Sequence, residues 1–121
     1  MNIKLILLLI FIPFFAISHE VNIEDKSVEE IVKQRMGNMS KIKAYSSKMY
    51  PLTMTGEFDE IKLVNEELLH AAKDFKELFP EGSQGGKASD LIWEDRETFD
   101  LYNDNFIKSI EDIALSIENE D

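Results

Sequence analysis

The sequence predicts an all-α fold, an antiparallel up-down helix bundle with three long helices. Three segments, near residues 27–49, 58–78 and 95–119, repeat apolar side chains at the spacing of one buried helix face. Proline and glycine separate the segments, and none shows the alternation of a strand. Three amphipathic helices of about 20 residues can form a bundle alone, or they can be three quarters of a four-helix bundle.

The first helix is expected to begin after Ser27, because the sequence SVEE is a capping box in which Glu30 bonds back to the cap residue. Lysines occupy one face of this helix, and apolar side chains occupy the other. Pro51 is expected to end the helix, and Gly56 lies in the turn that follows. The apolar stripe comprises Val28, Ile31, Val32, Met36, Met39, Ile42, Tyr45 and Met49.

The second helix is expected to end before Pro80 and the glycines that follow it. The third begins near Asp95. Between them lies the polar, glycine-rich segment KELFPEGSQGGKASDLIWED, in which Ile92 and Trp93 are expected to plug the apolar interior. The stripe of the second helix comprises Ile61, Val64, Leu68, Ala71, Ala72 and Phe75, and that of the third comprises Phe99, Tyr102, Phe106, Ile110, Ile113 and Ile117.

Residues 1–18 have the pattern of a secretory signal peptide. Lys4 precedes the apolar run LILLLIFIPFFA, and Ala16 and Ser18 are the small residues of a cleavage site. The run is shorter than the roughly 20 residues of a membrane span, although an uncleaved anchor is the alternative. We therefore expect cleavage after Ser18, export to the periplasm without a membrane anchor, and one domain of residues 19–121.

The composition of the exported domain excludes several functions. Without Lys4, 12 Lys and Arg remain against 24 Asp and Glu, a net charge of −12. Such a surface repels nucleic acid and favours basic partners. The chain has no cysteine, which excludes thiolate metal sites and disulfide catalysis. Hydrolase and nucleotide-binding signatures are absent, so we expect a protein that is not an enzyme.

Three segments resemble the cytochrome c′ family of periplasmic haem proteins. They are VKQRMGNM on the first helix, the segment LFPEGSQGGKASDLIWED, which is similar to the family's F-P-x-G-S/T-x-G-G…I-W-x-D loop, and the helix from Phe99 onward; together they cover about residues 28–121. The resemblance implies a four-helix bundle, bound haem c, electron transfer to a redox partner protein, and a homodimer formed through the first helix.

The sequence departs from the family at the haem attachment site. Family members carry C-x-x-C-H on a fourth helix, where two thiols bind haem covalently and the histidine ligates the iron. This chain has no cysteine, and its only histidines are His19 and His70. A lone helix histidine such as His70 is more often a packed or surface residue than a ligand. The resemblance therefore implies a domain truncated before the haem-attachment helix, without covalent attachment.

The resemblance places Met39, four residues after Arg35, at the sixth coordination position of the iron, with Met36 as the fallback ligand. Both methionines can equally fill gaps in the core. Arg35 lies among apolar positions, so it needs a partner, either a haem propionate or an acidic side chain on another helix. Lys87 matches a loop position near a propionate, or it is simply solvated.

Two functions therefore compete. The first is a periplasmic haem-binding electron-transfer protein of the cytochrome c′ type, incomplete in this chain. The second is a haem-free periplasmic helical bundle that binds a partner through an exposed groove. Thioether binding of Cu(I) is a weaker alternative, because the methionines have helical spacing. The side chains expected to face a fourth helix are Met39, Ile42, Phe75, Phe106 and Ile113.

Overall fold

The computed structural model describes residues 21–119, so the signal peptide predicted over residues 1–18 lies outside the described residues. Residues 21–119 form four helices and no strand, which confirms the all-α prediction. None of these helices is long and apolar enough to cross a membrane. The helices are α1 (Val28–Thr55), α2 (Phe58–Lys76), α3 (Leu91–Glu94) and α4 (Arg96–Glu118).

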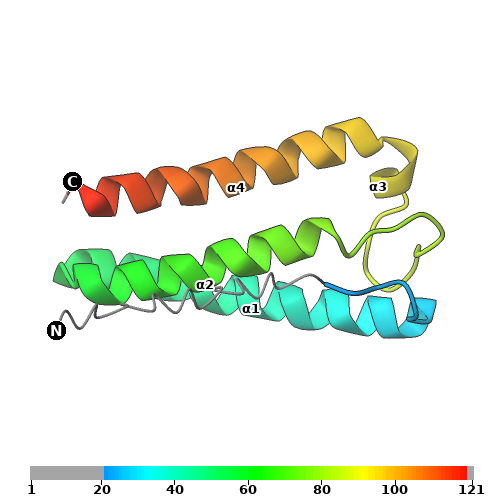
Figure 1. Cartoon of the computed structure of the whole chain (residues 1–121), viewed down its shortest axis with the longest axis horizontal. Coiled ribbons are helices and arrows are strands. Elements are labelled where there is room, and N and C mark those ends of the chain that lie inside the picture. The colour runs from blue at the N-terminus through cyan, green and yellow to red at the C-terminus, as the bar shows by residue number, and fades with distance from the viewer. Residues whose placement is uncertain (1–20, 120–121) are drawn as a thin grey trace, which may run out of the picture.

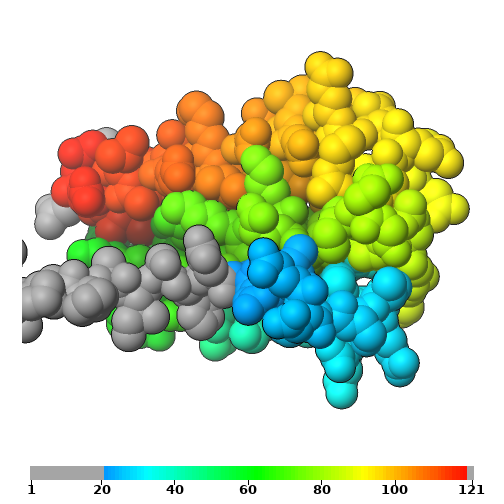
Figure 2. Space-filling view, turned by 45° about the vertical axis from the view of Figure 1, so that its right-hand side comes forward, coloured from blue at the N-terminus to red at the C-terminus, as the bar shows by residue number. Residues whose placement is uncertain are grey.

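The three long helices lie side by side, with α2 in the middle (Figure 1). Helix α2 packs against both α1 and α4, and the single turn of α3 packs on the start of α4, whereas no Cα atom of α1 lies within 8 Å of one of α4. The space-filling view shows the same order, with α2 between its two neighbours (Figure 2). The described residues therefore form an open row of helices in which α1 and α4 each have one long-helix partner.

Local sequence sets two of the three predicted helix starts, those of α1 and α4. At α1, the Glu30 N–H donates to Ser27 Oγ and the Ser27 N–H donates to Glu30 Oε2, which completes the capping box. At α4, Asp95 is the cap residue, and its side chain accepts a hydrogen bond from the Thr98 N–H. Both starts agree with the sequence prediction.

The prediction that Pro51 ends the first helix is wrong, because α1 continues to Thr55. A proline removes one helix hydrogen bond, and its ring is tolerated here at an exposed position. The hydroxyls of Thr53 and Thr55 donate to carbonyls of the preceding turn and support the last residues of the helix. The helix ends at Gly56, whose φ of 70° allows the left-handed cap that other residues rarely adopt.

The core is centred on α2. Burying one of its apolar side chains is worth roughly 1.5–3 kcal/mol. The buried apolar residues are Ile31, Ile61, Val64, Leu68, Ala71, Ala72, Leu78, Phe79 and Ile110, so α1 and α4 contribute only Ile31 and Ile110. The apolar stripe of α4, the third predicted helix, is therefore less buried than its helical spacing predicts, because Tyr102, Phe106 and Ile113 are exposed.

The five side chains expected to face a fourth helix differ in their surroundings. Met39, Phe106 and Ile113 are exposed. Ile42 instead packs against the core cluster of Leu68, Ala72 and Ile110. The Phe75 ring lies 4.8 Å from that of Phe79 and 6.3 Å from that of Phe99, centroid to centroid. Only part of the expected groove is therefore uncovered.

Candidate functional site

The four candidate site residues, Arg35, Met36, Met39 and Lys87, line one pocket of about 450 Å³. Helix α1 forms one wall, and the end of α2, the loop that follows it and Ile92 of α3 form the other. The remaining lining residues are Val32, Phe75, Phe79, Gly85, Ala88, Ser89 and Ile92. Most are apolar, and we call this the apolar pocket. Sequence reasoning had not assigned Phe75 or Phe79 to a site, although Phe79 belongs to the loop motif.

The charged residues of the apolar pocket are all cations. Arg35 and Lys87 line it, and no aspartate or glutamate within residues 21–119 does, in a chain that has 24 acidic residues. An apolar pocket with positive groups suits a largely apolar ligand that carries negative charge. Lys87 is exposed, so its ammonium group is free to reach such a ligand.

The two methionines of the pocket are not core residues of the described chain. Met36 is 51% exposed and Met39 is 46% exposed. A gap-filling methionine would be enclosed by other side chains. Both thioethers instead belong to the wall of the apolar pocket, and they come from consecutive turns of the same helix.

Arg35 is buried and hydrogen-bonds to the backbone of the loop. Its Nε–H donates to Leu78 O at 3.0 Å, and Nη2 donates to Ser83 O at 2.9 Å and to Ser83 Oγ at 3.0 Å. Nη1 lies 3.5 Å from Gly85 O, which it also donates to. The prediction of an acidic partner on another helix is wrong for the described residues, in which Arg35 forms no ion pair. Backbone carbonyls satisfy the guanidinium instead.

Aromatic rings enclose the Arg35 guanidinium. Its central carbon lies 4.4 Å from the centroid of the Phe79 ring and 5.3 Å from that of Trp93. The Trp93 indole is half-buried and donates its N–H to Pro80 O at 2.9 Å. Burial lowers the pKa of Arg35 from its ordinary value, but a guanidinium remains protonated at neutral pH. The cation is thus held by ring faces and by carbonyl dipoles.

Glycines bring the loop close to α1. Gly82, Gly85 and Gly86 all have positive φ. A Cβ on Gly86 would come within 2.9 Å of Val32 Cγ1, closer than such atoms approach in proteins. Another residue at Gly86 would therefore move this wall of the apolar pocket away from α1.

A family model described as cytochrome C' matches residues 30–121, a range that includes every residue of the apolar pocket. The chain belongs to the cytochrome c′ family. No significant match was found among the curated proteins or among the solved structures. The cytochrome c′ match makes this chain a haem-binding type of cytochrome at the level of the family.

The residues of this cytochrome c′ fit a haem in part. The apolar pocket offers apolar walls, two thioethers and two cations, which suit one face and the carboxylates of a haem. The 121 residues contain no cysteine, so none of them can form the thioether bonds of haem c. His70 is exposed on α2 and does not line the pocket, and residues 21–119 hold no cluster of three His, Cys, Asp or Glu that could bind a metal.

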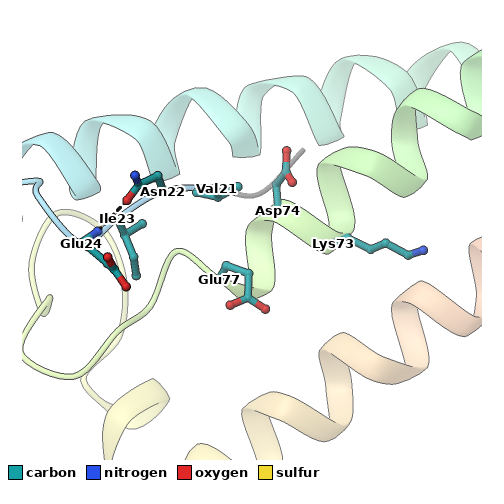
Figure 3. Close-up of a pocket in the computed structure, with 7 residues that line it drawn as sticks. All are labelled: Val21, Asn22, Ile23, Glu24, Lys73, Asp74 and Glu77. Carbon is teal, nitrogen blue, oxygen red and sulfur yellow. Dashed lines mark hydrogen bonds between the residues drawn. The ribbon is translucent and has the colours of Figure 1, made fainter. Parts of the chain in front are cut away.

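A second, polar hollow of about 550 Å³ lies on this cytochrome c′ between the segment that precedes α1 and the end of α2 (Figure 3). Val21, Asn22, Ile23 and Glu24 line one side, and Lys73, Asp74 and Glu77 line the other. No sequence pattern indicated this hollow. Its carboxylates do not form a cation site within the described range.

Proposed function

We propose that this chain is an exported, haem-binding electron carrier of the cytochrome c′ type. In this proposal the apolar pocket binds one face of the haem, Met39 is the iron ligand, and Met36 is the fallback. One observation carries the proposal: residues chosen from the sequence, on α1 and on a distant loop, line the same pocket.

Each wall residue has a defined task in this proposal. Haem supplies the one-electron iron couple, and a thioether ligand raises its reduction potential. Phe75, Phe79 and Ile92 would exclude water from the haem macrocycle. Lys87 and the remaining N–H of Arg35 would bind the carboxylates of the haem. The acidic surface suits a basic redox partner, and exposed Val28 and Tyr50, which lie outside the pocket, leave α1 free to form a homodimer.

The proposed location is the periplasm, with cleavage after Ser18. Its support is the signal-like pattern of residues 1–18 together with membership of a family that is typically exported. N-terminal sequencing of the protein recovered from a periplasmic fraction would test it. A chain that retains Met1 in the cytoplasm would contradict this part of the proposal.

Haem titration tests the central claim. The full chain is titrated with ferric haem, and binding is followed by haem absorbance and by quenching of Trp93, the only tryptophan. We expect saturable binding at one haem per chain, and a reduction potential that falls in Met39→Ala because the thioether ligand is lost. Met54→Ala is the matched control, since Met54 is 71% exposed and lies outside the apolar pocket. An unchanged potential in Met39→Ala would refute the ligand assignment.

The second candidate function is a haem-free helical bundle that binds a partner. The observation that favours it is the separation of the α1 and α4 backbones, no Cα atoms of which approach within 8 Å, together with the exposed Met39, Phe106 and Ile113 on those helices. A folded chain that shows no saturable haem binding would make this the better proposal.

A further inference from the structure

We propose that Arg35 is a positioning residue that holds the loop wall of the apolar pocket, through the backbone of Leu78–Gly85. Its contribution to ligand binding is then indirect, because the loop rather than the guanidinium contacts most of the ligand. The expected effect of Arg35 on ligand affinity rests on the proposed haem function, whereas its expected effect on the loop rests on the described contacts alone.

Arg35 acts as a clamp in the sense that its one guanidinium group binds several points of the loop. The guanidinium N–H groups donate to four oxygens, which belong to three residues spread along the loop, namely Leu78, Ser83 and Gly85. These acceptors engage four of the five N–H groups of a guanidinium. One N–H is left for a ligand, so the loop is the main partner of the side chain.

The clamped segment leads directly into the pocket wall. Gly85 is both an acceptor of Arg35 and a lining residue, and Lys87, Ala88 and Ser89 follow it in the lining. A second attachment is the close approach of Gly86 to Val32. Loss of the Arg35 bonds would leave three loop carbonyls without their partner and would free the wall between these attachments.

A lysine cannot replace this clamp. Its ammonium is a single point charge, whereas the acceptors of Arg35 surround a planar fork. If Arg35 served mainly as a charge for the ligand, Arg35→Lys would keep most of the affinity. If Arg35 is a clamp, Arg35→Lys fails, and guanidinium ion added to Arg35→Ala can refill the space between the carbonyls and the Phe79 and Trp93 rings.

The experiment compares Arg35→Ala, Arg35→Lys and the control Lys33→Ala in the full chain. Lys33 is exposed on the same helix and lies outside the pocket, so the control removes one positive charge without touching the loop. The readouts are hydrogen exchange of the amides of residues 78–89, Trp93 fluorescence, and the ferric haem affinity. Each is recorded with and without about 10 mM guanidinium chloride, far below its denaturing range.

We expect faster exchange in the loop and roughly tenfold weaker haem binding in both Arg35 variants, because bonds to a charged group are lost. Guanidinium should restore Arg35→Ala but not Arg35→Lys, and it should leave the wild type and Lys33→Ala unchanged. Unchanged loop exchange in Arg35→Ala, or full affinity in Arg35→Lys, would overturn the inference. A wild type that binds no haem overturns the proposed function alone, since the loop readouts remain.

If Arg35→Ala does not fold, Gly86→Ala tests whether the position of the loop controls binding, because it disturbs the second contact between the loop and α1, that of Gly86 with Val32. The added Cβ meets Val32 at a residue with φ of 63°, while Arg35 stays in place. The inference expects faster loop exchange and weaker haem binding that guanidinium does not restore. A loop that remains protected with unchanged affinity would show that its position does not control binding.

Discussion

Three buried asparagines differ in whether their side-chain N–H groups have a hydrogen-bond acceptor. Asn65 on α2 donates its side-chain N–H to Ile110 O at 3.1 Å, and Asn38 on α1 donates in the same way to Ala71 O at 3.0 Å. Each bond joins two helices and fixes their relative position. Asn103 is also buried, but its side-chain nitrogen has no partner among the described residues. A buried donor without a partner keeps the full cost of its desolvation.

Replacing Asn103 by leucine should therefore be more favourable than replacing Asn65 by leucine. Asn103→Leu removes an unpaired donor and no hydrogen bond, whereas Asn65→Leu removes a bond between α2 and α4 together with an unpaired Oδ1. We expect the free energies of unfolding of the two variants to differ by about 1 kcal/mol in favour of Asn103→Leu. Urea unfolding measures this difference, provided that the m-value, the slope of the free energy of unfolding against urea concentration, is the same in both variants. The reverse order would mean that Asn103 has a bound water or another partner in solution.

At the scale of elements, an ion pair links the end of α2 to α4. The Lys76 ammonium donates to Asp104 Oδ1 at 2.7 Å. This hydrogen bond raises the pKa of Lys76 above its ordinary value, against the opposing effect of desolvation. The two side chains are 35% and 59% exposed, so solvent screening keeps the stabilisation below about 1 kcal/mol.

The pH dependence of this pair follows from the sign of the pKa shift. Because the pKa of Lys76 is higher in the folded state, the pair stabilises the protein fully below about pH 10.4, the unfolded value. This contribution is lost as the pH rises through the folded pKa. We expect Lys76→Met to be less stable than the wild type at pH 8 and to approach it near pH 11.

Thermal unfolding at both pH values measures the effect. Lys73→Met is the control for Lys76→Met, because it removes an exposed lysine of α2 that forms no ion pair among the described residues. The gap between wild type and Lys76→Met should also narrow at high salt. A gap that persists at pH 11 would show that Lys76 acts through packing of its methylene groups.

At the scale of the whole molecule, the row of three helices leaves apolar side chains uncovered on α1 and α4. Met36 and Met39 are about half exposed, and Phe106 and Ile113 are each 37% exposed. Burying such a side chain completely is worth roughly 1.5–3 kcal/mol, so covering the exposed fractions of these four would add about 3–5 kcal/mol. That amount is comparable to the lower end of the 5–15 kcal/mol by which a small domain is stable.

We therefore expect residues 19–121 to be marginally stable or to self-associate without haem. Sedimentation should show concentration-dependent association, and the melting temperature should fall on dilution. The double variant Phe106→Gln/Ile113→Gln should be monomeric, whereas Leu63→Gln, an exposed position on α2, should associate like the wild type. A cooperative monomer that melts above about 65 °C would mean that three helices make a complete core, which favours the haem-free proposal.

The sequence by itself determined the features that depend on neighbouring residues. The Ser27 and Glu30 cap, the Asp95 cap and the period of the three stripes are all interactions within a few residues. The fold class follows from them. The resemblance to the cytochrome c′ family, which VKQRMGNM and the loop motif carry, also selected four residues that share a pocket.

Only the tertiary structure decided what the site residues contact. The partners of Arg35 lie 43 to 50 residues further along the chain and are mostly backbone carbonyls. Every residue type carries a carbonyl, so no sequence pattern could identify these acceptors. The burial of Ile42 and Phe106 was likewise not predictable, because each lies on an apolar stripe of helical spacing. Packing covers Ile42 and leaves Phe106 exposed, because burial depends on which helices meet, and here only α2 meets both of its neighbours.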